Sequence, residues 1–444
     1  MNHIKIFFWA FLIGLTGLWW LTDTPTLASL TTVASWRGML MQVTGVLAMG
    51  VMSVAMNLSS RPVLFEPYLG GLDKMYRLHK WLGIAALVLA VSHWLIANGP
   101  KWLSGLGLME RGAHGPRGGV SGDAVRQFFM GQKGIAESLG EWAFYAAAVL
   151  MVLALVKRFP YKYFLKTHRL LAVAYLALVW HSFILLKFDD WSGLIGPVML
   201  VLMMLGSAAA VMVLLGRVAI KRQLVGEVAG IRRHEALQVM EIDITFQGHW
   251  PGHEAGQFAF VTLHADEGAH PYTISSTWAN DGRMTFIIKA LGDYTSTLPE
   301  RVKLGDVVRV EGPYGRFNFD GGQQRQIWVG AGIGITPFIA RMQTLANVPD
   351  GRQIDLFHST RVLDPQAIRL MERDAAAAKV QLHVLSDARD GMLDAARIVQ
   401  LVPDWREADI WFCGPTGFGQ ALKHDFMAMG LASERFHQEL FEMR

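Results

Sequence analysis

Long apolar runs dominate the first half of the chain and are joined by short charged segments. Six of these runs carry few charges and approach or exceed the roughly 17 to 25 residues that a helix needs to cross a bilayer. They span residues 4–21, 38–58, 78–97, 142–156, 170–186 and 191–216. The pattern therefore predicts an all-α bundle of six transmembrane helices.

The first apolar run has a second interpretation. It could be the hydrophobic core of a signal peptide with a cleavage site at Leu27-Ala28-Ser29, which would leave five spans. Lys5 alone would give such a peptide only a thin basic region. We therefore keep six spans, which return the chain to the side on which it starts.

The orientation of the bundle follows from its basic residues. Lysine and arginine are more frequent at the ends of the runs that lie on the N-terminal side than at the opposite ends. Because short cytoplasmic loops are enriched in these residues, we expect both termini and the second half of the chain in the cytoplasm and the bundle in the inner membrane. The connection 98–140 weakens this prediction, because it places several basic residues on the opposite side.

Four histidines lie in or at the ends of the predicted spans, His79 and His93 on the third and His168 and His181 on the fifth. Ionisable side chains are costly inside a bilayer and are usually functional. The 14 residues between the first two correspond to about 21 Å and nearly four helical turns, so both lie on one face. The 13-residue spacing of the second two matches in depth but leaves them about 140° apart around an ideal helix. A π-bulge, a kink or a tilt would have to correct this difference.

Alternate spans run parallel, so His79 should face His168 at one level and His93 should face His181 at the other. Two neutral imidazoles on opposite sides of a porphyrin give a six-coordinate haem iron suited to electron transfer. Each histidine taken alone could equally be a core residue hydrogen-bonded between helices. The matched set of four favours two b-type haem sites that connect the two membrane surfaces.

Beyond residue 216 the pattern changes to short alternating strands such as 237–244 and 284–288, separated by Gly, Asp and Pro turns. This pattern predicts a small antiparallel β-barrel. Strands then alternate with helices, and the predicted strands are 326–329, 354–357, 381–385 and 409–412. We expect three domains: a transmembrane domain at 1–220, a β-barrel domain at 221–322 and an α/β nucleotide-binding domain at 323–444.

The composition supports a membrane half followed by a soluble half. Of the 444 residues, 52% are hydrophobic and only 18% are charged. The net charge is +4 and no basic run is interleaved with aromatic residues, so nucleic-acid binding is not expected. The single cysteine, Cys413, excludes an intrachain disulfide and a cysteine-ligated iron–sulfur cluster.

Three motifs in the second half carry the candidate chemistry. Residues 270–276 read His-Pro-Tyr-Thr-Ile-Ser-Ser, and residues 289–295 read Lys-Ala-Leu-Gly-Asp-Tyr-Thr. The glycine-rich sequence 330–337 directly follows a predicted strand, which is the context in which such a turn binds phosphate. With these motifs and the four histidines, the chain from about residue 39 to residue 444 resembles the NADPH oxidase and ferric reductase family, whose soluble half is of the ferredoxin-NADP reductase type.

The resemblance implies an FAD site in the barrel. Tyr272 would lie against the isoalloxazine ring and Thr273 would reach toward flavin N5, while the turn after Gly292 would present N–H groups to the pyrophosphate. His270 stands where soluble members usually carry arginine, and histidine there is typical of the membrane branch. The residues expected to contact FAD are His270, Pro271, Tyr272, Thr273, Ser275, Ser276, Lys289, Gly292 and Thr295.

The resemblance also implies a site for NADPH, with NADH as the alternative. Arg361 would bind the adenosine 2′-phosphate, because a guanidinium is a good phosphate ligand, although it could also be a solvated turn charge. Cys413 would lie near the hydride path or be an inert buried thiol, and Phe441 would cover the flavin face. The expected nucleotide-binding residues are Gly330, Gly332, Gly334, Thr336, Pro337, Ser359, Arg361, Cys413, Gly414 and Pro415.

The implied function is hydride transfer from NADPH to FAD, followed by passage of single electrons through the two haems to an acceptor on the far side of the membrane. The expected acceptor is O₂, which would yield superoxide, or alternatively a ferric or cupric chelate. A relay to a periplasmic partner protein and a haem-free flavin reductase are further alternatives. Membrane lipid and NAD(P)H are the other expected partners.

Overall fold

The computed structural model describes residues 2–22, 30–107, 124–156 and 158–439. The chain divides into two compact units, one formed by residues 1–70 and 74–218 and the other by residues 71–73 and 219–443. The possible signal-peptide cleavage site at 27–29 and Phe441 lie outside the described residues.

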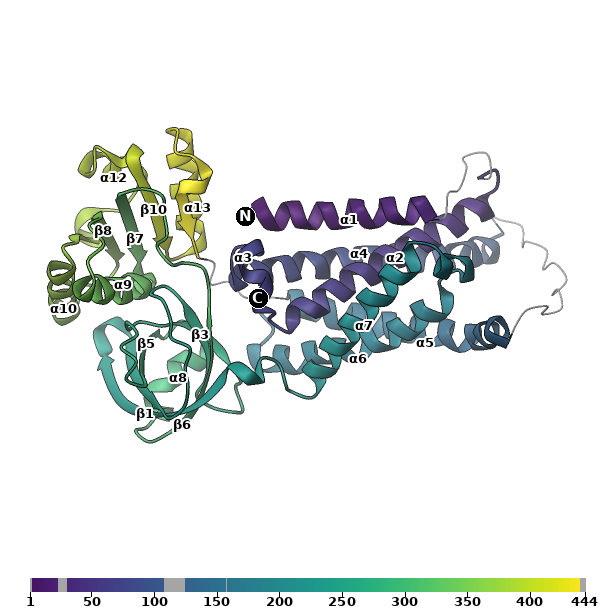
Figure 1. The fold of residues 1–444 in the computed structure, drawn as a ribbon, viewed down its shortest axis with the longest axis horizontal. Coiled ribbons are helices and arrows are strands. Elements are labelled where there is room, and N and C mark those ends of the chain that lie inside the picture. Colours follow the sequence, from purple (N-terminus) through teal and green to yellow (C-terminus); the bar gives the residue numbers. More distant parts are fainter. Residues whose placement is uncertain (1, 23–29, 108–123, 157, 440–444) are drawn as a thin grey trace. The chain divides into compact units, whose positions relative to one another are not determined.

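The first unit is the predicted six-helix bundle (Figure 1). The short helix α3, Glu66–Leu69, precedes the third long helix. The long helices are α1 (Asn2–Thr22), α2 (Val33–Ser59), α4 (Leu72–Gly105), α5 (Ala124–Leu155), α6 (Tyr161–Leu185) and α7 (Ile195–Leu214). Each is long and apolar enough to cross a membrane, which makes the chain a multi-pass membrane protein.

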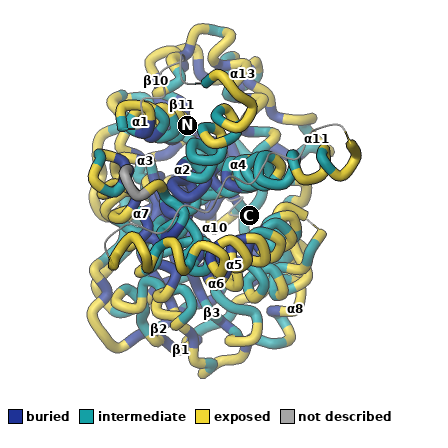
Figure 2. The backbone as a smooth tube through the Cα atoms, turned by 90° about the vertical axis from the view of Figure 1, so that its right-hand side faces the viewer, coloured by how far each residue is buried: buried dark blue, intermediate teal, exposed yellow. Residues whose placement is uncertain are grey.

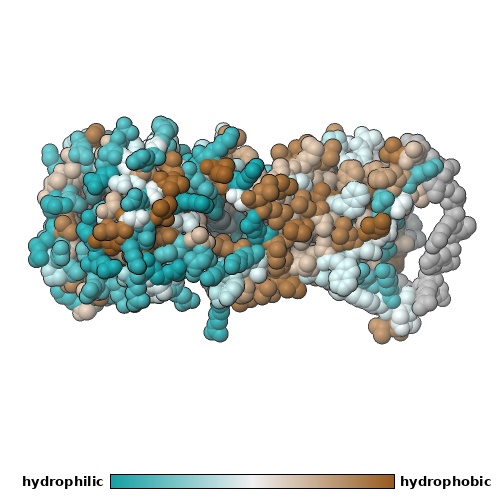
Figure 3. Space-filling model, turned by 90° about the horizontal axis from the view of Figure 1, so that it is seen from below, coloured by the Kyte–Doolittle hydropathy of each residue, from teal (hydrophilic) through white to brown (hydrophobic). Residues whose placement is uncertain are grey.

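Hydrophobic residues gather on the surface of this unit, whereas the surface of the second unit is mostly hydrophilic (Figure 3). Several helices extend beyond the predicted runs, and the largest difference is in α5, which begins at Ala124, 18 residues before the apolar run at 142. Arg126, Lys133 and Glu137 interrupt the apolar pattern but are good helix formers. The helix therefore begins well before the apolar stretch from which it was predicted.

Helices α2, α6 and α7 pack around a polar contact in the middle of the bundle. The hydroxyl groups of Ser53 and Tyr175 are 2.9 Å apart and both residues are buried. A Cβ atom at Gly206 of α7 would lie 2.0 Å from the Tyr175 hydroxyl. Glycine at residue 206 therefore allows α7 to approach the tyrosine. Met49, Met199 and Met203 belong to the surrounding apolar core.

The second unit begins with a six-stranded antiparallel sheet in the order β4-β3-β6-β1-β2-β5. Its strands are β1 (Gln223–His234), β2 (Val239–Phe246), β3 (Phe258–Thr262), β4 (His270–Thr273), β5 (Arg283–Lys289) and β6 (Val307–Tyr314), with helix α8 (Asp293–Arg301) between the last two. The predicted small antiparallel barrel is present as a sheet that is not closed. Among the described residues, an isolated bridge from Ile274 to Phe286 joins the two edges in place of a continuous ladder, because β4 ends at Thr273.

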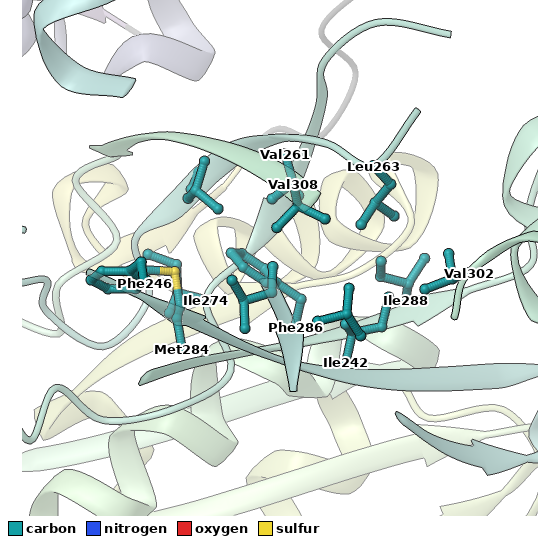
Figure 4. Packing of buried hydrophobic residues seen from close by; sticks show 14 of the residues in the cluster. Ile242, Phe246, Val261, Leu263, Ile274, Met284, Phe286, Ile288, Val302 and Val308 are labelled. Atoms are coloured by element: carbon teal, nitrogen blue, oxygen red, sulfur yellow. The ribbon is translucent and has the colours of Figure 1, made fainter. Parts of the chain in front are cut away.

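Apolar side chains fill the concave side of this sheet. Ile242, Phe286 and Val308 point toward one another from three different strands (Figure 4). Strand β2 alternates buried and half-buried residues along its whole length, as the period of two in its sequence predicts. The buried face holds together the sheet whose β4 edge carries the first candidate motif.

The unit ends with a five-stranded parallel sheet in the order β11-β10-β7-β8-β9. Its strands are β7 (Arg325–Ala331), β8 (Gln353–Thr360), β9 (Gln381–Ser386), β10 (Ala408–Cys413) and β11 (Phe436–Gln438). The helices are α9 (Thr336–Asn347), α10 (Pro365–Ala378), α11 (Asp387–Asp390), α12 (Ala395–Leu401) and α13 (Thr416–Ala428). The chain leaves β7 toward β8 and later returns to β10 on the other side, so the strand order reverses between β7 and β10. Ligands of open parallel sheets bind at the carboxyl ends of the strands beside such a reversal.

Candidate functional site

The four histidines of the bundle come together as two pairs. The ring centroids of His79 and His168 are 5.8 Å apart, and those of His93 and His181 are 6.4 Å apart. One imidazole of each pair comes from α4 and the other from α6. A metal ion that binds two opposed imidazole nitrogens at about 2 Å places their ring centroids about 6 Å apart. Both pairs therefore have the spacing of axial ligands to one metal ion.

The hydrogen bonds of the histidine rings determine which ring nitrogen is available to bind a metal. Nδ1 of His79 lies 2.9 Å from the Ala55 carbonyl oxygen, and Nδ1 of His181 lies 2.8 Å from that of Ala136. A carbonyl oxygen only accepts, so each Nδ1 carries the proton and each Nε2 keeps its lone pair. This is the usual state of a metal-ligating histidine.

His93 reaches the same state through a side chain. Its Nδ1 lies 3.1 Å from the Thr44 hydroxyl, which donates its own hydrogen to the Leu40 carbonyl oxygen at 2.6 Å. Thr44 must therefore accept from His93, which leaves the Nε2 lone pair free. The fourth ring, His168, stacks on Phe164 with centroids 5.0 Å apart, and its Nδ1 has no hydrogen-bond partner among the described residues.

Two glycines make room for the second pair. A Cβ atom at Gly140 of α5 would lie 1.9 Å from Nδ1 of His181, and one at Gly45 of α2 would lie 3.3 Å from Cε1 of His93. Sequence reasoning missed both residues, because only the tertiary structure shows which side chain a glycine faces. The described part of the chain contains no cluster of three or more His, Cys, Asp or Glu side chains suited to a metal ion. Paired imidazoles suit a porphyrin, which supplies the other four donors itself.

The azimuthal mismatch on α6 needs no π-bulge. The helix is regular from Tyr161 to Leu185, yet His168 and His181 both reach the histidines of α4. The rings are rotated against those of α4 by 66° in the first pair and 83° in the second. Helix placement and side-chain torsions together absorb the difference that an ideal-helix projection predicts.

The first flavin motif lies on the edge strand β4, where Tyr272 pairs with Ala259 and Thr273 with Phe258 of β3. The imidazole of His270 stacks on the Tyr294 ring with centroids 4.7 Å apart, which joins the two predicted FAD motifs. Burial lowers the pKa of His270, with Glu267 opposing this effect, so the ring presents a neutral face. Pro271 faces Phe260 in the same strand pair. The structure thus brings the two motifs side by side.

Several hydroxyl groups of these motifs accept hydrogen bonds from backbone N–H groups. Ser275 accepts from the Ile287 N–H at 3.3 Å, and Ser276 accepts from the Thr285 N–H at 3.1 Å, both across to β5, which ends at Lys289. Thr295 accepts from the Gly292 N–H at 3.0 Å. These contacts shape the loops around the expected flavin site. A Cβ atom at Gly292 would meet nothing within 4 Å, so the turn is open to a ligand.

The nucleotide motif lies at the reversal between β7 and β10. Gly330 at the end of β7 is in register with Cys413 at the end of β10. A Cβ atom at Gly334 would lie 2.2 Å from the Cys413 carbonyl oxygen, and one at Gly414 would lie 2.7 Å from Cβ of Ala331. Gly332 has φ +56° and faces open space. The loops after the two strands are therefore pressed together, and the half-buried Gly332 has open space on the side where a Cβ atom would lie.

The adjoining residues lie at the same edge of the sheet. Thr336 and Pro337 form the buried first turn of α9, where proline is favoured because the first helical N–H needs no partner. Pro415 caps α13 after β10. The N-termini of both helices thus lie at the carboxyl edge of the sheet, where their N–H groups favour phosphate.

Ser359 and Arg361 lie at and just beyond the end of β8. The Arg361 side chain is 92% exposed, and its Nε is 3.9 Å from a carboxylate oxygen of Asp387. The Ser359 hydroxyl lies 3.5 Å from the other carboxylate oxygen. Asp387 was not predicted and adds a negative charge beside the expected 2′-phosphate position.

Cys413 is fully buried, and its burial together with the charge of Glu439 raises the pKa of the thiol well above its ordinary value. Glu439 is 3% exposed and follows β11, which pairs with β10. The sequence did not reveal this residue, because only the pairing of β11 brings it near Cys413. A protonated thiol beside a buried carboxylate borders the expected nicotinamide position.

Comparison with known proteins divides the chain in the same way. Residues 44–179 match the family described as ferric reductase like transmembrane component, and residues 236–319 match the oxidoreductase FAD-binding domain. The matched transmembrane segment contains His79, His93 and His168 and ends just before His181. The matched FAD segment contains both flavin motifs.

Curated relatives match less than half of the chain. The flavohemoprotein of Bordetella pertussis is 28% identical over 44% of this chain and 54% of its own length. The NADPH oxidoreductase of Mycobacterium tuberculosis is 32% identical over 43% of this chain and 52% of its own length. The chain thus spans about half the length of the curated relatives it matches.

Among solved structures, the FAD/NAD binding domain of nitric oxide dioxygenase from Vibrio cholerae aligns with a TM-score of 0.43 and 20% identity, over 49% of this chain and 97% of that one. The two family matches, in their order along the chain, carry the assignment. The chain is an oxidoreductase with the architecture of the ferric reductase and NADPH oxidase family, a ferric reductase-like transmembrane domain followed by an FAD-binding reductase module.

Proposed function

We propose that the protein is a transmembrane flavocytochrome that carries electrons from NADPH through FAD and two b-type haems to an acceptor on the opposite side of the membrane. The observation that carries this proposal is the spacing of the two histidine pairs, 5.8 Å and 6.4 Å between ring centroids. Bound FAD would accept a hydride and release electrons singly, and each haem iron would carry one electron at a time.

The residues of the chain position these groups. His79 with His168, and His93 with His181, would bind the two haem irons, and the carbonyl oxygens of Ala55 and Ala136 hold two of these rings in the ligating tautomer. Tyr272 and Thr273 would contact the flavin ring. The glycine loop after β7 and the N-terminus of α9 would bind the nucleotide phosphates.

We place the flavin module in the cytoplasm and the bundle in the inner membrane, because the basic residues are more frequent on the N-terminal side of the spans. Arg361 supports NADPH as the donor, since its exposed guanidinium is available to a phosphate. The proposed acceptor is O₂, reduced to superoxide. A ferric or cupric chelate is the second candidate, because the transmembrane segment matches the ferric reductase description. A periplasmic partner protein is the third.

The test is the absorption spectrum of the purified full-length protein in detergent under argon, before and after addition of NADPH. We expect a low-spin b-type spectrum with two haems per FAD that becomes reduced by NADPH. Absence of haem, or haem that NADPH leaves oxidised, would overturn the proposal. Admission of air or of ferric citrate then separates the acceptors: fast reoxidation with superoxide identifies O₂, and fast reoxidation only by the chelate identifies a metal reductase.

A further inference from the structure

A carboxylate lies at the start of the apolar part of α5. Glu141 is near the middle of α5, 14 residues before the helix ends at Leu155, and it is exposed on the bundle surface. An ionisable side chain at such a depth is costly and is usually retained for function. Neighbouring residues on the same surface are Trp142, which is 74% exposed, and Tyr145, which is 37% exposed. Exposed turns of α5 are visible in Figure 2.

The carboxylate ends a chain of hydrogen bonds between two helices. The Trp94 indole N–H of α4 donates to the Tyr145 hydroxyl at 3.2 Å, and this hydroxyl donates to Glu141 at 2.7 Å. Aromatic rings surround the chain: Trp94 stacks on Phe144 with centroids 5.6 Å apart and meets Trp102 at 5.0 Å. The result is an aromatic surface on the outside of the bundle, in which most rings meet at steep angles and polar hydrogen-bonding groups lie among them.

This surface lies at the level of the second histidine pair. Trp94 directly follows His93, and Glu141 directly follows Gly140, whose Cα faces the ring of His181. Ala136, one turn earlier on α5, accepts a hydrogen bond from the same histidine. The aromatic surface is therefore next to the site at which electrons would leave the bundle.

We propose that the Trp94–Tyr145–Glu141 surface binds the head group of a lipid-soluble quinone and that the protein reduces this quinone to the quinol. The inference rests on the transmembrane electron path proposed above and adds a lateral acceptor within the bilayer. A quinone ring can stack on aromatic side chains, and its carbonyl oxygen can replace Glu141 as the acceptor of the Tyr145 hydroxyl. Its isoprenoid tail belongs in the lipid that this face of the bundle contacts.

Reduction of a quinone consumes protons, and this gives the Glu141 carboxylate a role. The balanced step is NADPH + H⁺ + quinone → NADP⁺ + quinol, in which two electrons arrive through the bundle and two protons bind the quinone oxygens. Electron carriers deliver no protons, so a protein group must supply them inside the apolar layer. The Tyr145 hydroxyl can give its proton to the quinone, and Glu141, which accepts a hydrogen bond from that hydroxyl at 2.7 Å, can relay protons to it from water beyond the bilayer. O₂ reduction to superoxide needs no such group.

The first experiment measures binding and needs no electron transfer. The oxidised full-length protein in lipid nanodiscs is titrated with decylubiquinone, and quenching of tryptophan fluorescence is followed. We expect saturable binding that weakens on the order of tenfold in Glu141→Gln and in Tyr145→Phe. Glu137→Gln is the matched control, because Glu137 is also an exposed carboxylate, one turn away on α5. Binding that fails to saturate, or that responds equally to all three variants, overturns the site.

The second experiment measures quinol formation after reduction by NADPH under argon. Glu141→Gln should slow quinol formation by on the order of tenfold or more, while haem reduction by NADPH and reoxidation by ferricyanide stay unchanged. Equal quinol rates in wild type and Glu141→Gln overturn the proposed proton relay. Failure of NADPH to reduce the haems would refute the electron path instead, and the binding titration would still decide the quinone site.

Discussion

Gly334 lies so close to Cys413 that a Cβ atom on the glycine would be 2.2 Å from the cysteine carbonyl oxygen. The contact joins the loops after β7 and β10 at the reversal of the strand order. Because the neighbouring atoms are backbone, they cannot move aside as a flexible side chain would. The nucleotide loop therefore tolerates only glycine at residue 334.

Gly334→Ala should displace the loop and weaken NADPH binding. An overpacked contact costs about 1 to 3 kcal/mol, which corresponds to a rise in KM for NADPH of roughly tenfold or more. FAD content should remain normal, since the flavin motifs lie on the other sheet. Gly322→Ala is the control, because a Cβ atom there meets nothing within 4 Å and the residue lies before β7, away from the nucleotide loop. An unchanged KM in Gly334→Ala would contradict the assignment of this loop.

Gly140→Ala should remove the haem that we propose His93 and His181 bind. The added methyl group would lie 1.9 Å from Nδ1 of His181 and would push the ring away from its partner. The measurement is the number of haems per FAD, which should fall from two to one as in His181→Leu. Gly134→Ala on the same helix faces open space and should keep both haems. Two haems in Gly140→Ala would show that the ring position is not needed for ligation.

Arg361 and Asp387 should act in opposite directions on nucleotide choice. Arg361→Ala should raise the KM for NADPH by about tenfold and leave the KM for NADH nearly unchanged, because only NADPH carries the 2′-phosphate. Asp387→Asn should lower the KM for NADPH, since the carboxylate 3.9 Å from Arg361 competes for its charge. Parallel steady-state assays with the two nucleotides decide the matter. Equal responses of both KM values would exclude a 2′-phosphate site here.

The sequence predicts the helices of the bundle better than it predicts which distant residues come into contact. Six apolar runs suffice to identify six spans, and the spacing of His79 and His93 predicts their common face. The start of α5 was missed, because Arg126, Lys133 and Glu137 end the apolar run without ending the helix. Hydrophobic periodicity reports burial and lipid contact, whereas helix propensity decides where a helix stops.

The residues that sequence reasoning missed depend on contacts between distant segments. Gly140 faces His181 from another helix, and Glu439 reaches Cys413 only because β11 pairs with β10. Closure of the flavin sheet depends in the same way on how β4 meets β5, for which a local period of two carries no information. Local patterns thus identify the elements and the motifs, and packing decides their partners.

Lowering the pH should destabilise the soluble unit already at pH values above those at which carboxyl groups titrate. His358 is buried, its Nδ1 donates to the Gly330 carbonyl oxygen at 3.1 Å, and burial lowers its pKa to about 4. Between pH 4 and its ordinary pKa of 6.5 the unfolded chain therefore binds more protons than the folded one, and stability falls as the pH falls through this window. A shift of this size corresponds to about 3 kcal/mol.

The measurement is the midpoint of thermal FAD release, followed by flavin fluorescence, at several pH values between 7.5 and 5. The midpoint should fall as the medium becomes more acidic, and His358→Gln should reduce this dependence, because glutamine keeps an N–H donor for Gly330 without a titrating ring. His253, whose pKa is also lowered by burial, contributes with the same sign and leaves a residual slope. A steeper pH dependence in His358→Gln would contradict the prediction.

The two histidine levels on α4 are 14 residues apart, which is about 21 Å within a hydrocarbon core of about 30 Å. An electron that travels from one level to the other therefore crosses most of the membrane's electric field, and turnover becomes a current. Each 100 mV across the bilayer changes the driving force by up to about 2.3 kcal/mol per electron. Depolarisation would slow or accelerate the protein according to the direction of flow, so the spacing of two histidines couples its rate to the energetic state of the cell.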